Sequence, residues 1–236
     1  KKNISVIIGN PPYNANQQSE NDNNKNREYT IIDKRIKDTF VKYSTAQKTK
    51  VYDMYSRFYR WAMDRLHQNG IIAFVTNRSL IDARGFDGFR KCIQDDFDFA
   101  YIIDLGGDIR ENYGKKNESI GNVFNIQTGV AIVFLIHKTP LTKADKRGVT
   151  QNKCRIYYSE VDDSWNKDKK LFWLTTSKLG TINFKLIQPD KNNNWINLSV
   201  NEWDKLIPVF DKQNKSNQEN HTLFNIFSNG IASNRD

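Results

Sequence analysis

Short β-branched runs alternate with longer amphipathic segments over residues 4–137, and this alternation constrains the fold more than any other feature. The β-branched runs predict buried strands, and the segments whose apolar residues recur every three to four positions predict helices. Strands joined by helices of this length form right-handed crossovers and hence a mostly parallel sheet. The sequence therefore predicts an α/β fold with strands at 4–8, 71–76, 101–105 and 130–137, and helices at 30–43, 51–68 and 86–97.

The connections refine this prediction. No helical pattern precedes 130–137, and a strand reached by a non-helical excursion is expected to be antiparallel. Gly70 is expected to cap the helix over 51–68. Beyond residue 138 the pattern weakens. A strand is predicted at 154–161, and the Asn- and Lys-rich stretches 192–194 and 212–220 indicate linkers.

The net charge of the chain indicates what kind of partner it binds. The chain has 36 Lys and Arg against 27 Asp and Glu, a formal net charge of +9, which favours a polyanion such as nucleic acid. No apolar run reaches the roughly 18–20 residues of a membrane helix. Cys92 and Cys154 have neither the spacing of a metal site nor that of a disulfide framework. We therefore expect no membrane partner, no metal and a reducing, cytoplasmic compartment.

Four residues after the first predicted strand carry the chemistry: Asn10, Pro11, Pro12 and Tyr13. In open α/β sheets, ligands bind beyond the carboxyl ends of strands. The Asn10 side-chain oxygen and the Pro11 carbonyl could accept both hydrogens of a planar amine and stabilise the positive charge that grows as the amine attacks a methyl donor. The two prolines stiffen the turn, and Tyr13 offers an aromatic face on which a base can stack. Pro-Pro also occurs in ordinary turns, but the preceding strand and the following aromatic residue favour a site.

This tetrapeptide resembles that of the adenine-N6 methyltransferases, which use S-adenosylmethionine and carry Asn-Pro-Pro-Tyr after the fourth strand of their sheet. The resemblance implies the C-terminal half of a Rossmann-like class I methyltransferase sheet, with Asn10, Pro11, Pro12 and Tyr13 as catalytic residues. It also implies that Phe124 stacks on the other face of a base flipped out of the duplex, which restores part of the lost stacking energy. The alternative for Phe124 is ordinary core packing.

More of the chain resembles the methyltransferase portion of single-polypeptide, type ISP-like restriction-modification enzymes. The resemblance implies nuclease and helicase regions upstream and a target-recognition domain downstream in the same polypeptide. It divides the chain into the catalytic half at 1–139, an extension after the last sheet strand at 140–225 and the junction to target recognition at 226–236. The similar segments are the tetrapeptide, 21–24, 51–55, 60–62, 70–77 and 234–236.

The family's donor-binding glycine motif precedes Asn-Pro-Pro-Tyr and is therefore expected upstream of Lys1. The segment 104–108 also pairs an acid with Gly-Gly, but it follows a late strand, and Gly-Gly alone is a weak indication. The resemblance thus implies a fragment that carries the target-base pocket. We expect it to be inactive on its own and to bind S-adenosylmethionine weakly or not at all.

Double-stranded DNA is the expected substrate, with Arg78, Lys115 and Lys116 as candidate phosphate contacts, although each could instead lie on a solvated face. The same acceptor geometry suits any planar amine, so methylation of RNA or of a protein glutamine is an alternative. The charge of +9 argues against a protein substrate. A non-catalytic DNA-binding scaffold derived from a methyltransferase is a further alternative, against which the intact tetrapeptide counts.

Overall fold

The computed structural model describes residues 4–12, 28–45, 54–107, 122–124, 126, 128–138, 154–162, 164–196 and 207. The chain divides into two compact units, 1–198 and 199–236. The architecture below is that of the first unit.

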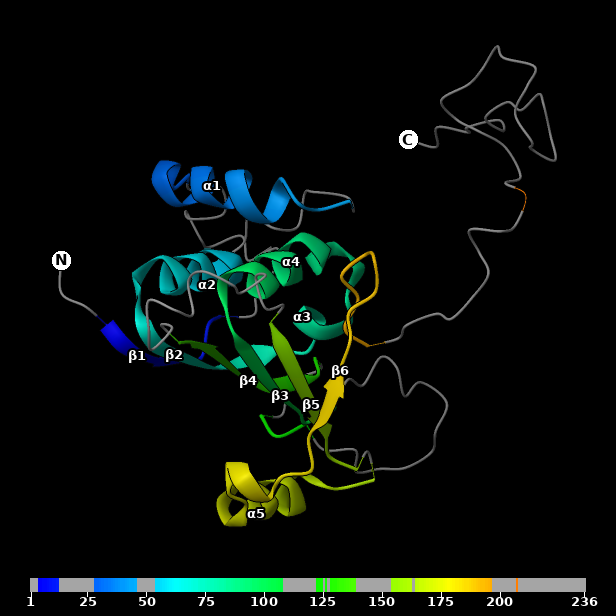
Figure 1. Ribbon diagram of the computed structural model, residues 1–236. Coiled ribbons are helices and arrows are strands. Elements are labelled where there is room, and N and C mark those ends of the chain that lie inside the picture. The colour runs from blue at the N-terminus through cyan, green and yellow to red at the C-terminus, as the bar shows by residue number, and fades with distance from the viewer. Residues whose placement is uncertain are drawn as a thin grey trace, which may run out of the picture. The chain divides into compact units, whose positions relative to one another are not determined.

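Six strands form one sheet in the order β1-β2-β4-β3-β5-β6 (Figure 1). The pairs β1–β2 and β3–β5 are parallel, whereas β4 is antiparallel to both its neighbours and β6 is antiparallel to β5. The predicted mostly parallel sheet with an antiparallel strand at 130–137 is therefore confirmed. The strands are β1 (Ile4–Gly9), β2 (Leu66–Asn77), β3 (Phe99–Asp104), β4 (Val130–His137), β5 (Arg155–Glu160) and β6 (Lys185–Ile187).

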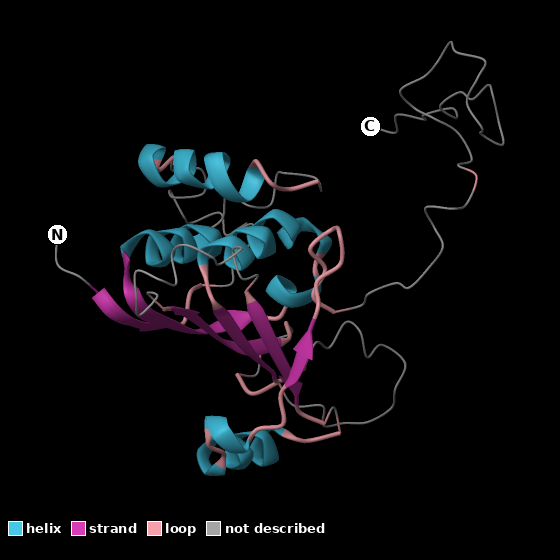
Figure 2. Ribbon diagram, in the orientation of Figure 1, coloured by secondary structure: helices cyan, strands magenta, loops and turns pink. Residues whose placement is uncertain are grey.

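The helices cover both faces of this sheet (Figure 2). Four of them lie on one face, with α2 and α4 next to the strands and α1 stacked outside α2, while α5 lies on the other face. The turn Lys37–Val41 continues α1 as a π-helix, and short 3₁₀ turns lie at Arg84–Phe86 and Leu179–Thr181. The α-helices are α1 (Thr30–Ile36), α2 (Met54–Arg65), α3 (Ser79–Asp82), α4 (Asp87–Asp96) and α5 (Lys167–Thr176).

Aromatic side chains fill the core between the sheet and α2 and α4. The Tyr59 ring meets those of Phe74 and Phe89 edge-on, with centroids 4.9 and 5.0 Å apart. Phe40, from the π-helical turn, stacks on Phe89 at 4.0 Å, which ties the outer helical layer to the inner one. A second apolar cluster, around Leu105 and the first residues of β4, lies under α5. Both faces of the central strands are therefore covered, as a largely parallel sheet requires.

Strand pairing corrects the sequence prediction at one helix end. The helix predicted over 51–68 ends at Arg65, and β2 begins at Leu66. Gly70 therefore lies inside a strand, where it pairs with His137 of β4, and the prediction that it caps a helix is wrong. The physical reason is that Leu66 pairs with Ile4 of β1 and Gly70 with His137 of β4, and a longer helix would lose both pairings.

The sheet also extends further along the chain than predicted. The strand predicted at 154–161 is present as β5, but β5 and β6 join the main sheet, so 130–137 is not its last strand. The stretch 192–194 is not a free linker: Trp195 is buried, and Arg90 Nε of α4 donates to the Asn193 carbonyl at 2.7 Å. The predicted linker at 212–220 and the junction at 226–236 lie outside the described residues.

Within the described part of the chain, no helix is long and apolar enough to cross a membrane. The same residues hold no group of three or more His, Cys, Asp or Glu side chains that could bind a metal ion. Cys92 and Cys154 are both buried and unpaired by disulfide.

Asp87, at the N-terminus of α4, accepts hydrogen bonds from the segment that follows the π-helical turn. The Ser44 hydroxyl donates to Asp87 Oδ1 at 2.5 Å, and the Thr45 backbone N–H and hydroxyl donate to Oδ2 at 2.7 and 2.8 Å. Burial by itself raises the pKa of this carboxyl. The hydrogen bonds from Ser44, Thr45 and Gly88 outweigh burial and hold the pKa below its ordinary value. The ionised carboxylate is therefore the form that stabilises this junction.

We expect Asp87→Asn to lower the free energy of unfolding at pH 7 by about 1–3 kcal/mol, because buried donors lose their carboxylate acceptor. Since the folded pKa of Asp87 lies below the unfolded one, the wild-type advantage is complete above about pH 4 and disappears as the pH falls through the folded pKa. Urea titrations at pH 7 and pH 3 measure how much the difference in unfolding free energy between wild type and Asp87→Asn decreases at the lower pH. The exposed Asp38→Asn is the control, and a difference that stays constant with pH would contradict the assignment.

Candidate functional site

The ends of four strands meet at one edge of the sheet. Gly9, Asn77 and Asp104 end the parallel strands β1, β2 and β3. Because β4 is antiparallel, it begins at this same edge, where Val130 pairs with Asn77. Only β2 separates β1 from β4, so these two strands are about 10 Å apart, two strand spacings. The segment after β1 and the segment before β4 therefore emerge beside each other.

The segment after β1 is the predicted catalytic turn. Asn10 and Pro12 are exposed, whereas Pro11 between them is buried. Just before them, Gly9 packs so closely on the Phe74 ring that a Cβ there would lie 3.1 Å from the ring. The turn is thus anchored through Gly9 and Pro11, and Asn10 is left accessible. Tyr13 lies outside the described residues.

The segment before β4 carries Phe124. The Phe124 side chain is 46% exposed, while its neighbours Asn122 and Val123 are 4% and 6% exposed. The core-packing alternative for Phe124 therefore does not hold, since its neighbour Val123 takes the position in the apolar cluster. Phe124 is an accessible aromatic ring at the edge where Asn10 is exposed.

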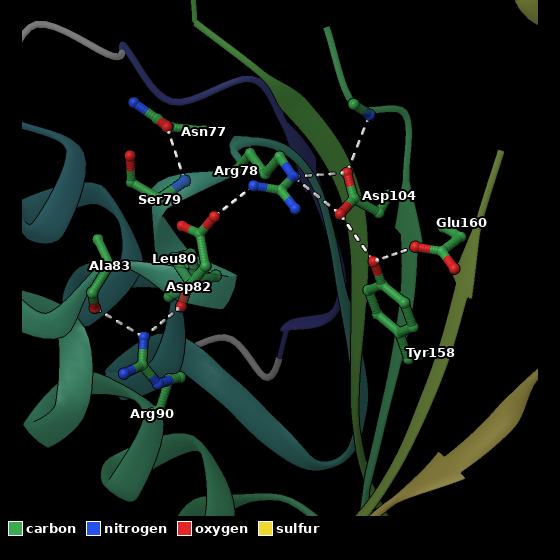
Figure 3. A network of polar contacts seen from close by, with 11 residues as sticks. Asn77, Arg78, Ser79, Leu80, Asp82, Ala83, Arg90, Asp104, Tyr158 and Glu160 are labelled. Carbon is green, nitrogen blue, oxygen red and sulfur yellow. Dashed lines mark hydrogen bonds and ion pairs between the residues drawn. The ribbon is translucent and has the colours of Figure 1, made fainter. Parts of the chain in front are cut away.

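A buried ionic network centred on Asp104 lies at the same edge (Figure 3). Arg78 Nε donates to Asp104 Oδ2 at 2.9 Å, and Arg78 Nη1 is paired with Asp82. The Tyr158 hydroxyl donates to Asp104 Oδ2 at 2.9 Å and lies 3.1 Å from a Glu160 carboxylate oxygen. Burial, together with these two carboxylates, raises the pKa of Tyr158 far above its ordinary value, so its hydroxyl remains a donor. The network joins the ends of β2, β3 and β5.

This network bears on two sequence predictions. The Arg78 guanidinium uses at least two nitrogens on carboxylates, so a contact with DNA phosphate would compete with Asp82 and Asp104. The Asp104 carboxylate also accepts the Gly106 backbone N–H at 2.9 Å, which holds the Gly-Gly turn after β3. This acid thus serves the protein's own structure, in keeping with its interpretation as the end of a late strand. Lys115 and Lys116 lie outside the described residues.

Sequence reasoning missed one residue of the site. Asn122 is buried and bonds to three backbone groups around the Phe124 turn. The indication was present in the spacing, because asparagine two residues before a turn position commonly accepts a backbone N–H in an Asx turn.

The arrangement of strands defines a class: a methyltransferase-like α/β sheet, with the candidate site at its carboxyl edge. The fold agrees with the solved structure of DrdV bound to DNA, with 46% identity and a TM-score of 0.76 over 94% of this chain. The type ISP restriction-modification enzyme LlaGI, bound to a DNA substrate mimic, gives 34% identity and a TM-score of 0.75 over 89%. DNA-bound LlaBIII, an ATP-dependent type ISP enzyme, gives 33% and 0.73 over 89%.

Residues 1–110 match the family model of the Eco57I restriction-modification methylase. The predicted resemblance to the methyltransferase portion of type ISP-like enzymes is therefore confirmed. The chain spans 21%, 19% and 14% of the lengths of the DrdV, LlaGI and LlaBIII chains. Among curated proteins, none matches this chain significantly.

Proposed function

We propose that this chain provides the target-base pocket of an S-adenosylmethionine-dependent DNA adenine-N6 methyltransferase within a longer restriction-modification polypeptide. The observation that carries the proposal is the exposure of Asn10, on an anchored turn, and of Phe124 at the same edge of the sheet. An exposed amide and an exposed aromatic ring at one edge of the sheet are groups that can bind a planar base carrying an amine.

The chemistry of these groups fits an exocyclic amine. The Asn10 Oδ1 atom accepts one N6 hydrogen and the Pro11 carbonyl accepts the other. Two fixed acceptors favour a pyramidal nitrogen and stabilise the positive charge that develops during methyl transfer. Phe124 stacks on one face of the base and Tyr13 on the other, which offsets the stacking lost when the base leaves the duplex. S-adenosylmethionine supplies the electrophilic methyl group, and the N6 proton leaves to water.

Duplex DNA is the substrate that the charge and the relatives favour. The net charge of +9 suits a phosphate backbone, and the matched DrdV, LlaGI and LlaBIII structures are complexes with DNA or a DNA mimic. The nuclease, helicase and target-recognition regions of the proposed polypeptide would flank this chain, which spans 14–21% of those relatives.

In this proposal, the binding site for the methyl donor S-adenosylmethionine belongs to the part of the polypeptide that precedes β1. The Gly-Gly segment after β3 does not fit S-adenosylmethionine, because its acid, Asp104, already binds Arg78, Tyr158 and Gly106. In addition, Val6 and Ile8 of the edge strand β1 are 57% and 78% exposed. Apolar side chains on an open strand edge favour coverage by further structure. A neighbouring donor-binding half would bury them.

The test is a methylation assay with the full-length polypeptide, S-adenosylmethionine carrying a labelled methyl group, and unmethylated duplex DNA. We expect the label in N6-methyladenine when the DNA is hydrolysed and its nucleosides are separated by mass spectrometry. The isolated chain, as the control, should give no label. Label in RNA or in protein glutamine instead would identify the alternative methyltransferases, and binding of DNA without any transfer would identify a scaffold.

A further inference from the structure

Phe124 presents an unusual contrast with its surroundings. Its ring is 46% exposed, although Val123 is buried and Asn122 is nearly inaccessible. A large apolar side chain on a mobile turn would lose conformational freedom on binding a base, which weakens binding. A ring held in advance by a rigid turn avoids this loss. The question is therefore what fixes the turn.

The Asn122 side chain connects three backbone positions. Its Oδ1 atom accepts the Phe124 N–H at 2.8 Å. Its Nδ2 group donates to the Thr128 carbonyl at 2.5 Å and to the Gly107 carbonyl at 3.3 Å. A buried amide is stable only when its polar atoms have partners, and here the acceptor and the donor group are both used. One side chain thus joins the end of the β3 segment, the start of β4 and the Phe124 turn.

The backbone around Asn122 leaves little room for another arrangement. Gly107 has a φ of +85°, and a Cβ there would lie 3.2 Å from the Asn122 Cα. Just before β4, Gly129 packs on the Arg78 side chain, and its carbonyl accepts the Arg78 backbone N–H at 2.9 Å. The two segments that Asn122 connects are therefore themselves fixed to the sheet.

We propose that Asn122 is a positioning residue for base binding: it holds Phe124 where the ring stacks on the flipped base. The inference rests on the proposed function. Asn122 touches neither base nor donor and acts only through the turn. Its contribution should consequently vanish when the Phe124 ring is absent, which separates positioning from a general effect on stability.

A double-mutant cycle in the full-length polypeptide tests this dependence. We expect Phe124→Ala to lower kcat/KM for duplex DNA by about 10- to 100-fold, as loss of one base–aromatic stack implies, and Asn122→Ala to lower it several-fold. The double variant should match Phe124→Ala alone. If the two effects multiply, Asn122 acts independently of the ring and the proposal is wrong.

Two further variants serve as a control and as a replacement if Asn122→Ala does not fold. Asn166→Ala is the matched control, because Asn166 also accepts a backbone N–H, that of Lys169 at 2.9 Å, but caps α5 rather than the Phe124 turn. It should leave kcat/KM within twofold of wild type. If Asn122→Ala fails to fold, Asn122→Asp replaces it: this variant keeps the acceptor for the Phe124 N–H and loses the two Nδ2 donations. Its kcat/KM should then lie between those of wild type and Phe124→Ala.

A measurement that needs no DNA distinguishes failure of the positioning role of Asn122 from failure of the proposed function. 4-Trifluoromethylphenylalanine at position 124 of the full-length polypeptide gives one ¹⁹F resonance, whose shift and width report the order of the ring. We expect Asn122→Ala to move this resonance toward the position of the unfolded protein, and Asn166→Ala to leave it in place. An unchanged resonance in Asn122→Ala overturns the positioning role. Absence of adenine methylation in the wild type overturns the proposed function, whatever the resonance shows.

Discussion

Asn10→Ala in the full-length polypeptide is expected to lower kcat for adenine methylation by at least about 100-fold, the usual cost of removing one fixed polar group from a transition state. The substitution removes the side-chain acceptor for one N6 hydrogen, so the positive charge on the attacking nitrogen loses a partner. Asn10 is exposed, so the free energy of unfolding should change by no more than about 0.5 kcal/mol. The measurements are single-turnover methylation with saturating DNA, and urea denaturation of the same preparations.

Two companion variants make this result specific. Asn10→Asp keeps an acceptor oxygen at the same position and should retain more activity than Asn10→Ala. Asn183→Ala removes an exposed asparagine before β6 and should leave kcat unchanged. Unchanged methylation in Asn10→Ala would remove Asn10 from the catalytic site. A loss of kcat accompanied by an equal loss in Asn183→Ala would instead indicate a general defect.

The sequence was sufficient for three of the strands. Continuous β-branched runs predicted β1, β3 and β4 within two residues of their ends, because such runs have few other uses in a globular chain. It failed at β6, since Lys185–Ile187 is too short for any periodicity and is fixed by pairing with β5. It also failed at Leu66, which continues the apolar face of α2 but starts β2. Pairing between distant segments decided both cases.

In the candidate site, too, local features could be predicted from the sequence, whereas contacts between distant residues could not. The local motif at Asn10 predicted an accessible turn at a strand end, and the exposure of Asn10 agrees with that expectation. The surroundings of Arg78 could not be predicted, because its partner Asp104 lies 26 residues away and Tyr158 reaches Asp104 across 54 residues. A basic residue at a strand end suggests phosphate binding only until its carboxylate partners are known.

Asp104→Ala is expected to lower the free energy of unfolding by about 3–5 kcal/mol, the cost of removing one partner from a buried ion pair. Asp104 is 3% exposed and accepts hydrogen bonds from Arg78, Tyr158 and Gly106. The change leaves an arginine and a tyrosine hydroxyl without a common acceptor where water has little access.

The control for Asp104→Ala is Asp95→Ala, which breaks the ion pair with Lys91 on the surface of α4, where both side chains are well exposed. Surface pairs of this kind contribute about 0–1 kcal/mol, because water and salt screen them. Urea denaturation at pH 7 measures both variants. If the two lose the same stability, Asp104 is not the centre of a buried network. If Asp104→Ala alone is destabilised, the ends of β2, β3 and β5 depend on this carboxylate. The Asp104 network then stabilises the edge of the sheet that presents Asn10 and Phe124.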